Sequence, residues 1–306
     1  MAKSIMDFWK EAAAEITDTS KILDTTAILD KSAVLEINSN NGKPIIFFVN
    51  GHFSKFVPGP AYGGKKYWDY FDPSIPKNSA IYFGIKKNFH QQYVNGSSLI
   101  SIDSSGQERF EKGYEFAKNN FISFKNILIN NSVYFVCHSE GCAFAAGIAK
   151  YFFEKKINIG EIIFLSCDEG DEFEIDFNVN AYQVEYMYYD KSIPDGNCEP
   201  EFDWIINTNK NSGGVKGINK FGIIIEKVEY DTVHGSTANS EIFKSIEDLK
   251  EVKIINNLNK KGRSFNSQTI VTNNTKFYLV DKQIIDTNNP QWNKNILEVD
   301  YTMPCK

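Results

Sequence analysis

The sequence predicts an α/β protein built on a mostly parallel, doubly wound sheet. Apolar runs that suit buried strands alternate along the chain with segments of helical periodicity, which favours parallel strands joined by crossover helices. The runs at 44–49 and 133–137 are continuously apolar, and the run at 162–167 is apolar except for Ser166, as expected for strands covered on both faces. With 306 residues and 42% hydrophobic content, the chain can bury a sizeable core.

Three parts can be distinguished along the chain. Residues 1–43 are expected to form an N-terminal helix and a lead-in segment. Residues 44–249 hold the alternating strands and helices, whereas residues 250–306 have the pattern of a small β-rich appendage packed on the main domain. This appendage could equally complete the sheet of a partner protein. Its expected strands are 268–272, 276–285 and 296–301.

Local patterns predict the elements of the main part. Its first strand, Pro-Ile-Ile-Phe-Phe-Val, ends in a turn at Asn50-Gly51. The segment 107–129 has aromatic residues at near-helical spacing and is expected to be a helix. The segments 54–78 and 86–106 contain turn residues and are expected to be loops. The remaining expected strands are 80–85, 133–137, 162–167, 181–189 and 221–230, and the remaining expected helices start near 143 and at 240.

Composition and charge exclude several classes of protein. The formal net charge of −6, without a basic stripe, argues against nucleic-acid binding. No apolar run approaches 18 residues, so no transmembrane segment is expected. The first residues carry acidic side chains and lack a hydrophobic stretch, so no signal peptide is visible. We therefore expect a protein that is cytoplasmic on synthesis and that could leave the cell only by a signal-less route.

The five cysteines are an odd number and lack the spacing of a metal site. Cys137 and Cys167 fall in predicted core strands, which favours free buried thiols and a reducing compartment. No glycine-rich phosphate loop is present either. We expect neither a metal nor a cofactor.

The segment 133–150 is the strongest functional signal. A buried strand changes into a helix of small residues over residues 138–142, His-Ser-Glu-Gly-Cys, which leaves no room for an ordinary loop. A serine on such a sharp turn projects its hydroxyl above the sheet, and Gly141 allows the helix to fold back closely. The usual pattern is G-x-S-x-G, and Cys137 occupies the place of its first glycine. The alternative is a buried strand followed by Ser139 as a helix N-cap.

A serine nucleophile needs a base, which is most often histidine. Of the four histidines, His234 follows a late strand in a turn and could reach Ser139, so it is the expected base. His138 adjoins the serine and should point to the other side of the turn, which favours a structural role. His52 is expected to line the pocket, and His90 to be solvated in a polar connection.

An acid should orient the histidine. Asp190 directly follows the strand at 181–189, and the chain order Ser139, Asp190, His234 matches that of a hydrolase triad. Asp195 is a rival, and Asp168, at the end of the preceding strand, is a weaker one. The alternative for Asp190 is an ordinary turn residue, which is the commonest role of an aspartate in such a loop.

The oxyanion hole should use two backbone N–H groups. One is that of Glu140, and the other comes from the loop after the first strand, at His52 or Phe53. The Glu140 carboxylate could be solvated at the helix start, where it suits the helix dipole, or could repel anionic substrates.

These residues resemble the serine α/β-hydrolase superfamily over roughly 44–249. More narrowly, the chain resembles lipase-like domains of bacterial, especially Bacteroidetes, polymorphic-toxin and Rhs-associated proteins. The segments that carry the resemblance are Phe48-Val49-Asn50-Gly51, Tyr67-Trp68, Arg109 with Gly113-Tyr114, His138-Ser139-x-Gly141 and Ala145 to Tyr151. The resemblance implies hydrolysis of a small-molecule or lipid ester and delivery as an effector. The chain departs from the family pattern at Cys137 and Glu140.

Ser139 would then form an acyl-enzyme, with the loops at 53–71 and 191–220 as acyl pocket or lid. Two alternatives remain open on sequence grounds. The chain could be a non-catalytic binding module with the same fold, or an acyltransferase or thioesterase with the same triad.

Overall fold

The computed structural model describes ten stretches of the chain. They are 43–52, 63–86, 88–97, 104–128, 131–189, 200–202, 214–224, 234–251, 268–271 and 276–280. The expected elements at 1–42 and 296–301 lie outside these stretches. No helix among the described residues has the length and apolar character needed to cross a membrane.

The described strands form one sheet in the order β2-β1-β3-β4-β5-β7-β9-β8, with β6 paired to β5. Neighbours from β2 to β7 in this order run parallel, and β9 and β8 are antiparallel. The strands are β1 (Ile45–Asn50), β2 (His90–Asn95), β3 (Val133–His138), β4 (Ile159–Leu165), β5 (Ala181–Tyr189), β6 (Pro200–Phe202), β7 (Lys220–Ile224), β8 (Gln268–Val271) and β9 (Lys276–Val280).

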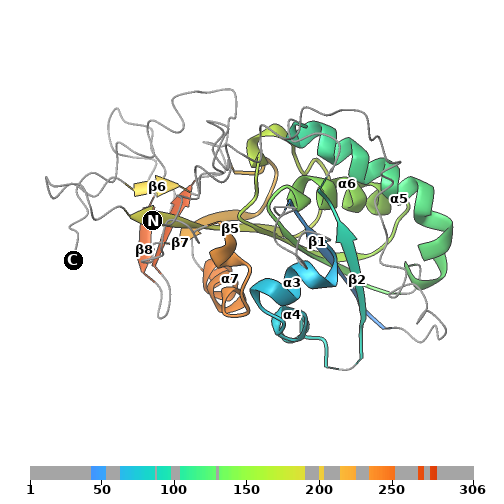
Figure 1. The fold of residues 1–306 in the computed structure, drawn as a ribbon, viewed down its shortest axis with the longest axis horizontal. Coiled ribbons are helices and arrows are strands. Elements are labelled where there is room, and N and C mark those ends of the chain that lie inside the picture. The colour runs from blue at the N-terminus through green and yellow to red at the C-terminus, as the bar shows by residue number, and fades with distance from the viewer. Residues whose placement is uncertain are drawn as a thin grey trace, which may run out of the picture.

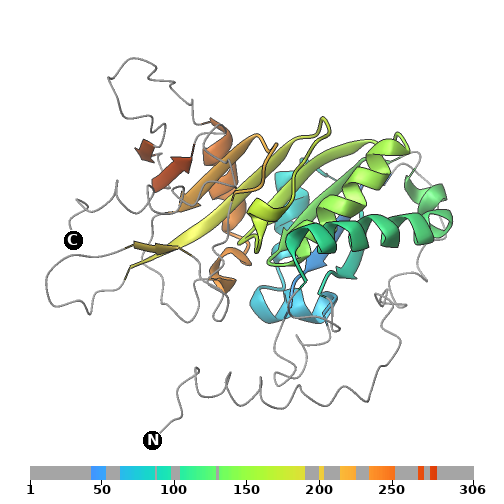
Figure 2. The same ribbon diagram turned by 90° about the horizontal axis from the view of Figure 1, so that it is seen from above.

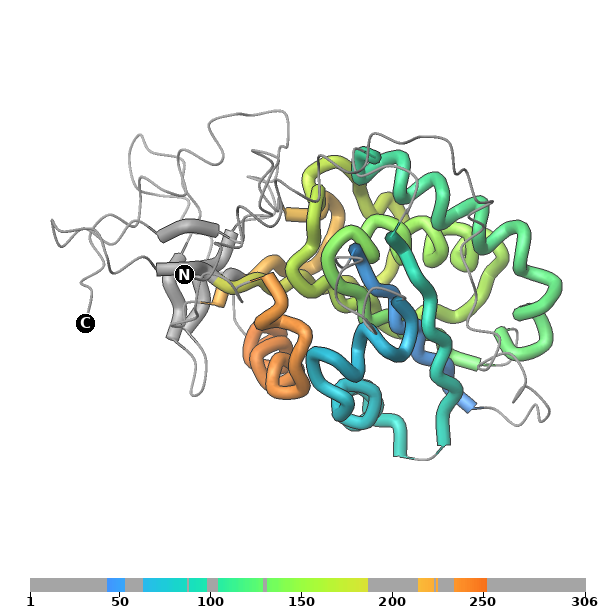
Figure 3. The backbone as a smooth tube through the Cα atoms, viewed as in Figure 1, coloured from blue at the N-terminus to red at the C-terminus, as the bar shows by residue number. Residues whose placement is uncertain are grey.

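Helices cover both faces of this sheet, as the alternating pattern predicts. Helices α5 (Gly106–Leu128) and α6 (Gly141–Glu154) lie on one face. Helices α3 (Lys65–Phe71), α4 (Ile75–Tyr82) and α7 (Ile242–Glu251) lie on the other (Figures 1 and 2). Two short 3₁₀ helices are also present: η2 (Gly170–Glu172) follows β4, and η4 (Gly235–Thr237) precedes α7. The tube in Figure 3 follows the backbone through both layers. The α/β prediction is therefore confirmed.

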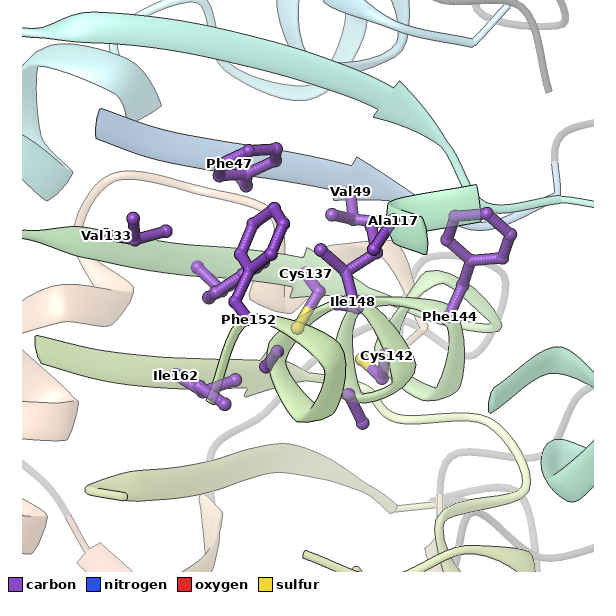
Figure 4. Packing of buried hydrophobic residues seen from close by; sticks show 14 of the residues in the cluster. Phe47, Val49, Ala117, Val133, Cys137, Cys142, Phe144, Ile148, Phe152 and Ile162 are labelled. Carbon is purple, nitrogen blue, oxygen red and sulfur yellow. The ribbon is translucent and has the colours of Figure 1, made fainter. Parts of the chain in front are cut away.

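The core has two halves because residues of a strand alternate between the faces of the sheet. Phe135 and Cys137 of β3 belong to the half under α5 and α6, which Figure 4 shows from close by. Phe47 stacks on Phe135 there, with ring centroids 5.2 Å apart. Val136 belongs to the half under α3, α4 and α7. This alternation puts Cys137 and His138, the two residues before Ser139, in different layers.

Helices α5 and α6 cross at glycines. A Cβ on Gly147 would lie 1.9 Å from the Phe110 carbonyl oxygen, and one on Gly113 would lie 2.0 Å from the Phe144 carbonyl oxygen. The backbones can approach this closely only because neither position carries a side chain. The small residues of α6 thus hold the helix after the serine turn tightly against α5.

Three local predictions were wrong. The segment 80–85 is not a strand, because α4 covers it up to Tyr82; Pro76 lies in the first turn of this helix, where proline is favoured. The expected loop at 54–78 contains α3, and the expected loop at 86–106 contains β2. The polar sequence of β2, His-Gln-Gln-Tyr-Val-Asn, carries little strand signal, and pairing with β1 overrides it.

The C-terminal strands are not set apart from the main sheet. Strand β9 pairs antiparallel with β7, and β8 pairs with β9, so both extend the sheet that contains Ser139's strand. These strands lie inside the predicted ranges 268–272 and 276–285. The division at residue 250 remains a prediction.

Candidate active site

Ser139 lies on a sharp turn between β3 and α6. Its backbone has a φ of 59°, in the left-handed region that residues with a Cβ rarely adopt. The Ser139 N–H donates to the Leu165 carbonyl at 3.1 Å, so the turn begins while the chain is still paired to β4. Cys142 N–H donates to the Ser139 carbonyl at 2.9 Å and starts the helix. Such strain at a strand-to-helix serine is the geometry of a nucleophile elbow.

Two glycines allow the loop after β1 to pack on this turn. A Cβ on Gly141 would lie 2.6 Å from the Val49 carbonyl oxygen, and a Cβ on Gly51 would lie 2.5 Å from the Ser139 Cβ. The same Gly51 Cβ would lie 2.8 Å from the Glu140 nitrogen. Gly51 therefore lies directly against the backbone N–H that the sequence analysis assigns to the oxyanion hole.

Cys137 fits the place of the missing glycine. It is completely buried, and its thiol donates to the Ile163 carbonyl at 3.0 Å. Cys142 and Cys167 are also buried and free, so the described cysteines are thiols, as predicted. Cys198 and Cys305 lie outside the described residues.

His234, which lies between β7 and α7 in the chain, is next to the same turn. Its carbonyl accepts a hydrogen bond from Nε2 of His138, the neighbour of Ser139, at 2.9 Å. The rings of His138 and His234 have centroids 5.0 Å apart. His234 also interacts electrostatically with Glu140 and Asp168. The structure thus brings the predicted base next to the predicted nucleophile's turn.

Further contacts hold the segment after His234. Thr237 Oγ1 and Ser166 Oγ share a buried hydrogen bond of 2.8 Å, which ties the segment to the end of β4. Ser240 N–H donates to Asp72 Oδ2 at 2.8 Å, which ties it to the end of α3. The segment after His234 is therefore held by hydrogen bonds to residues that follow β4 and α3.

Asp168 is a buried carboxylate whose charge interacts with that of His234. It follows β4 and is 6% exposed. Burial and the charge of Glu169 raise the pKa of Asp168 to about 7, while His234 lowers it. Ser166 and Glu169 flank it with φ values of 40° and 56°, so the loop is strained on both sides. The predicted acids Asp190 and Asp195 lie outside the described residues.

Arg109 is a buried cation at this end of the sheet. Its side chain is 1% exposed; Nη2 donates to Glu140 Oε1 at 2.8 Å, and Nε donates to Glu169 Oε2 at 3.3 Å. Burial raises the pKa of Glu140, and the charge of Arg109 opposes that effect. Of the two alternatives for Glu140, a solvated carboxylate does not hold, because its side chain is only 13% exposed and pairs with Arg109.

The sequence pattern alone gave Arg109 no role in the candidate site. A signal for it exists in the sequence: Arg109 lies four residues before Gly113, on the face of α5 that packs against α6. A charged residue on a buried helix face needs a charged partner.

His52 lies beside the turn at the end of β1. Its Nδ1 is 3.2 Å from Ser97 Oγ. Burial, with a smaller contribution from Arg109, lowers the pKa of His52, which favours the neutral ring. The loop is held by Asn50, whose Nδ2 donates to Asn95 Oδ1 at 3.0 Å and whose Oδ1 accepts from Gly64 N–H. Phe53, the other predicted source of an oxyanion donor, lies outside the described residues.

Part of the predicted lid is core. Tyr67 and Trp68 belong to α3 and are 1% and 0% exposed, so they cannot move as a lid without opening the core. A groove of about 420 Å³ lies between α4 and β2, but none of its lining residues belongs to the serine turn. Among the described residues, no cluster of three or more His, Cys, Asp or Glu could hold a metal ion.

No family model matches the chain, and no curated protein matches it. Among solved structures, it is similar to Aspergillus fumigatus lipase B, at 12% identity over 47% of this chain and 37% of that chain, with a TM-score of 0.28. It is also similar to olei00960, a hydrolase from Oleispira antarctica, at 15% identity over 47% of this chain and 46% of that chain, with a TM-score of 0.23. The matched region spans less than half of either protein.

Sheet order and turn geometry define the class of this protein. Parallel strands with helices on both faces end at one edge, where a strained serine begins a helix of small residues. The chain is an α/β protein with a mostly parallel sheet covered by helices on both faces.

Proposed function

We propose that this protein is a serine hydrolase that cleaves carboxylic esters through an acyl-enzyme on Ser139. The observation that carries the proposal is the left-handed φ of 59° at Ser139. The residue before it, His138, binds the His234 backbone through its side chain. Backbone strain of this kind costs about 1–3 kcal/mol and is retained where function requires it.

The reaction uses the residues as follows. His234 takes the proton of the Ser139 hydroxyl as its oxygen attacks the ester carbonyl, and then gives that proton to the leaving alcohol. Water, deprotonated by His234, releases the acid and restores Ser139. Glu140 N–H and a second N–H from the loop at His52 and Phe53 bind the oxyanion.

We assign the orienting acid to Asp168. Its burial, its electrostatic interaction with His234 and the strain on both sides of it support this choice over an ordinary turn role. Asp190 and Asp195, which chain order favours, remain the rival predictions. Asp168→Asn and Asp190→Asn separate them, because loss of the orienting acid lowers kcat by about 10⁴-fold whereas loss of a surface turn residue does not.

The ester is expected to be uncharged or cationic at the cleavage site. Among the described residues, Glu140 and Glu169 pair with the Arg109 guanidinium and the charge of Asp168 also interacts with it, so an added carboxylate near Ser139 would meet acidic side chains. A lipid ester and delivery as a bacterial effector, which the family resemblance implies, are further proposals. A protein partner at the C-terminal strands is another.

The test is labelling by a fluorophosphonate probe, with Ser139→Ala and His234→Ala alongside. We expect the parent to label and both variants to lose labelling by at least about 10³-fold. A panel of p-nitrophenyl and lipid esters then defines the substrate. A well-folded parent that neither labels nor hydrolyses any of these esters contradicts the proposal and favours a binding module.

A further inference from the structure

His138 lies directly behind the nucleophile, in the layer under α3. It ends β3, is completely buried and is surrounded by aromatic rings. The ring centroids of Phe71, Tyr67 and Trp68 lie 5.6, 5.8 and 6.5 Å from that of His138. A histidine in such a position needs hydrogen-bond partners for both ring nitrogens.

Both nitrogens have partners of defined polarity. Nε2 of His138 lies 2.9 Å from the His234 carbonyl oxygen, which can only accept, so Nε2 carries a proton. Nδ1 lies 2.5 Å from the Tyr67 hydroxyl. In the neutral ring Nδ1 is an acceptor, so Tyr67 donates to it. Burial raises the pKa of Tyr67, which keeps that hydroxyl protonated.

We propose that Tyr67 and His138 form a positioning relay for the base His234. The His234 carbonyl fixes the Nε2-protonated tautomer of His138, the Tyr67 hydroxyl holds the ring in place through Nδ1, and the Nε2–H holds the His234 backbone beside the elbow. This inference rests on the serine hydrolase function proposed above. Both residues act through His234, so they are positioning residues rather than catalytic ones.

The place of the relay explains why it matters for the reaction. It joins two residues 96 positions apart, at the point where the base loop meets the nucleophile's strand. A displacement of about 1 Å in a reacting group costs roughly 100-fold in rate. The other anchors of the loop, at Thr237 and Ser240, lie further along the chain than His234.

The first experiment removes only the hydroxyl, with Tyr67→Phe. Without it, Nδ1 of His138 loses its partner, and the ring can turn so that Nε2–H leaves the His234 carbonyl. We expect kcat for a p-nitrophenyl ester and the fluorophosphonate labelling rate to fall roughly tenfold, with KM changed less than about twofold.

Tyr93→Phe is the matched control. Tyr93 is a buried tyrosine in the same layer, stacked on Phe48, and its hydroxyl donates to Gln91 Oε1 at 2.8 Å without reaching His138. We expect this variant to keep parental kcat and labelling.

A second pair separates positioning from packing. Glutamine at His138 keeps an N–H that can reach the His234 carbonyl, whereas leucine fills similar space without a donor. We expect His138→Gln to retain roughly tenfold more activity than His138→Leu. If packing were the role, leucine would serve as well as glutamine.

The outcomes distinguish this inference from the function on which it rests. A reactive parent with unchanged kcat in Tyr67→Phe overturns the relay alone, as does a leucine variant that equals the glutamine variant. A folded parent without any reactivity overturns the proposed function and the relay with it.

Discussion

Ser139 shows at the scale of one residue how a strained backbone lowers stability at the proposed nucleophile. A left-handed conformation costs a residue with a Cβ about 1–2 kcal/mol, and glycine avoids most of this cost. We therefore expect Ser139→Gly to raise the free energy of unfolding by about 0.5–1 kcal/mol while abolishing probe labelling. Urea unfolding with parallel labelling measures both effects.

Lys156 offers the control for that experiment. It has a φ of 60° but is exposed in the turn after α6. Lys156→Gly should gain similar stability and keep full labelling. If Lys156→Gly gains stability and Ser139→Gly loses it, then the serine hydroxyl has a structural role that the strain argument omits.

The raised pKa of Asp168 leads to an expectation of how the free energy of unfolding depends on pH. Its pKa of about 7 in the folded protein exceeds the value near 3.9 of an unfolded chain, because burial and Glu169 disfavour its charge. The folded state therefore holds this proton more tightly. The resulting stabilisation is complete below about pH 4 and is lost as the pH rises through about 7, by up to about 4 kcal/mol.

Asp168→Asn cannot titrate at this position and should not show that loss. The difference in melting temperature, variant minus parent, should therefore increase between pH 5 and pH 8. Thermal unfolding across this range measures it. A difference that stays constant with pH would mean that Asp168 is already ionised at pH 5.

At the scale of elements, the contact between α5 and α6 should be intolerant of added atoms. A Cβ at Gly147 would meet the Phe110 carbonyl, which belongs to the backbone and cannot move alone. We expect Gly147→Ala to lower the free energy of unfolding by about 1–3 kcal/mol, as other overpacked cores do. Chemical denaturation measures this loss.

Gly84→Ala is a useful comparison because it changes backbone strain alone. Gly84 has a φ of 68°, and nothing lies within 4 Å of its added Cβ, so the cost should be about 1 kcal/mol. A Gly147→Ala variant as stable as the parent would show that α5 and α6 can move apart without penalty.

Elements with strong local signals were predicted, and those with weak signals were not. The buried runs of β1, β3 and β4 and the spacing of α5 are legible because burial on known faces dictates their residues. β2 is polar, and α4 is short with an apolar run that suits either a helix or a strand. Pairing and packing with other parts of the chain decide such segments.

At the scale of the whole molecule, the C-terminal strands complete a sheet. A chain that ends after Glu251 would leave the edge of β7 without its partner β9. We expect such a truncation to melt at a lower temperature and to self-associate through the exposed edge. Thermal unfolding and light scattering test this. A monomeric truncation with parental stability would support the separate appendage that the sequence favours.

The sequence by itself determined the fold class, the serine turn and the identity of the candidate base. These depend on local properties: a buried strand, a glycine two residues after Ser139, and few histidines to choose from. Only the tertiary structure decided that Arg109 pairs with Glu140, that the charges of Asp168 and His234 interact, and that His138 holds the His234 backbone. Each of these interactions joins residues far apart in the chain, and such distances are set by sheet order and helix packing rather than by any local pattern.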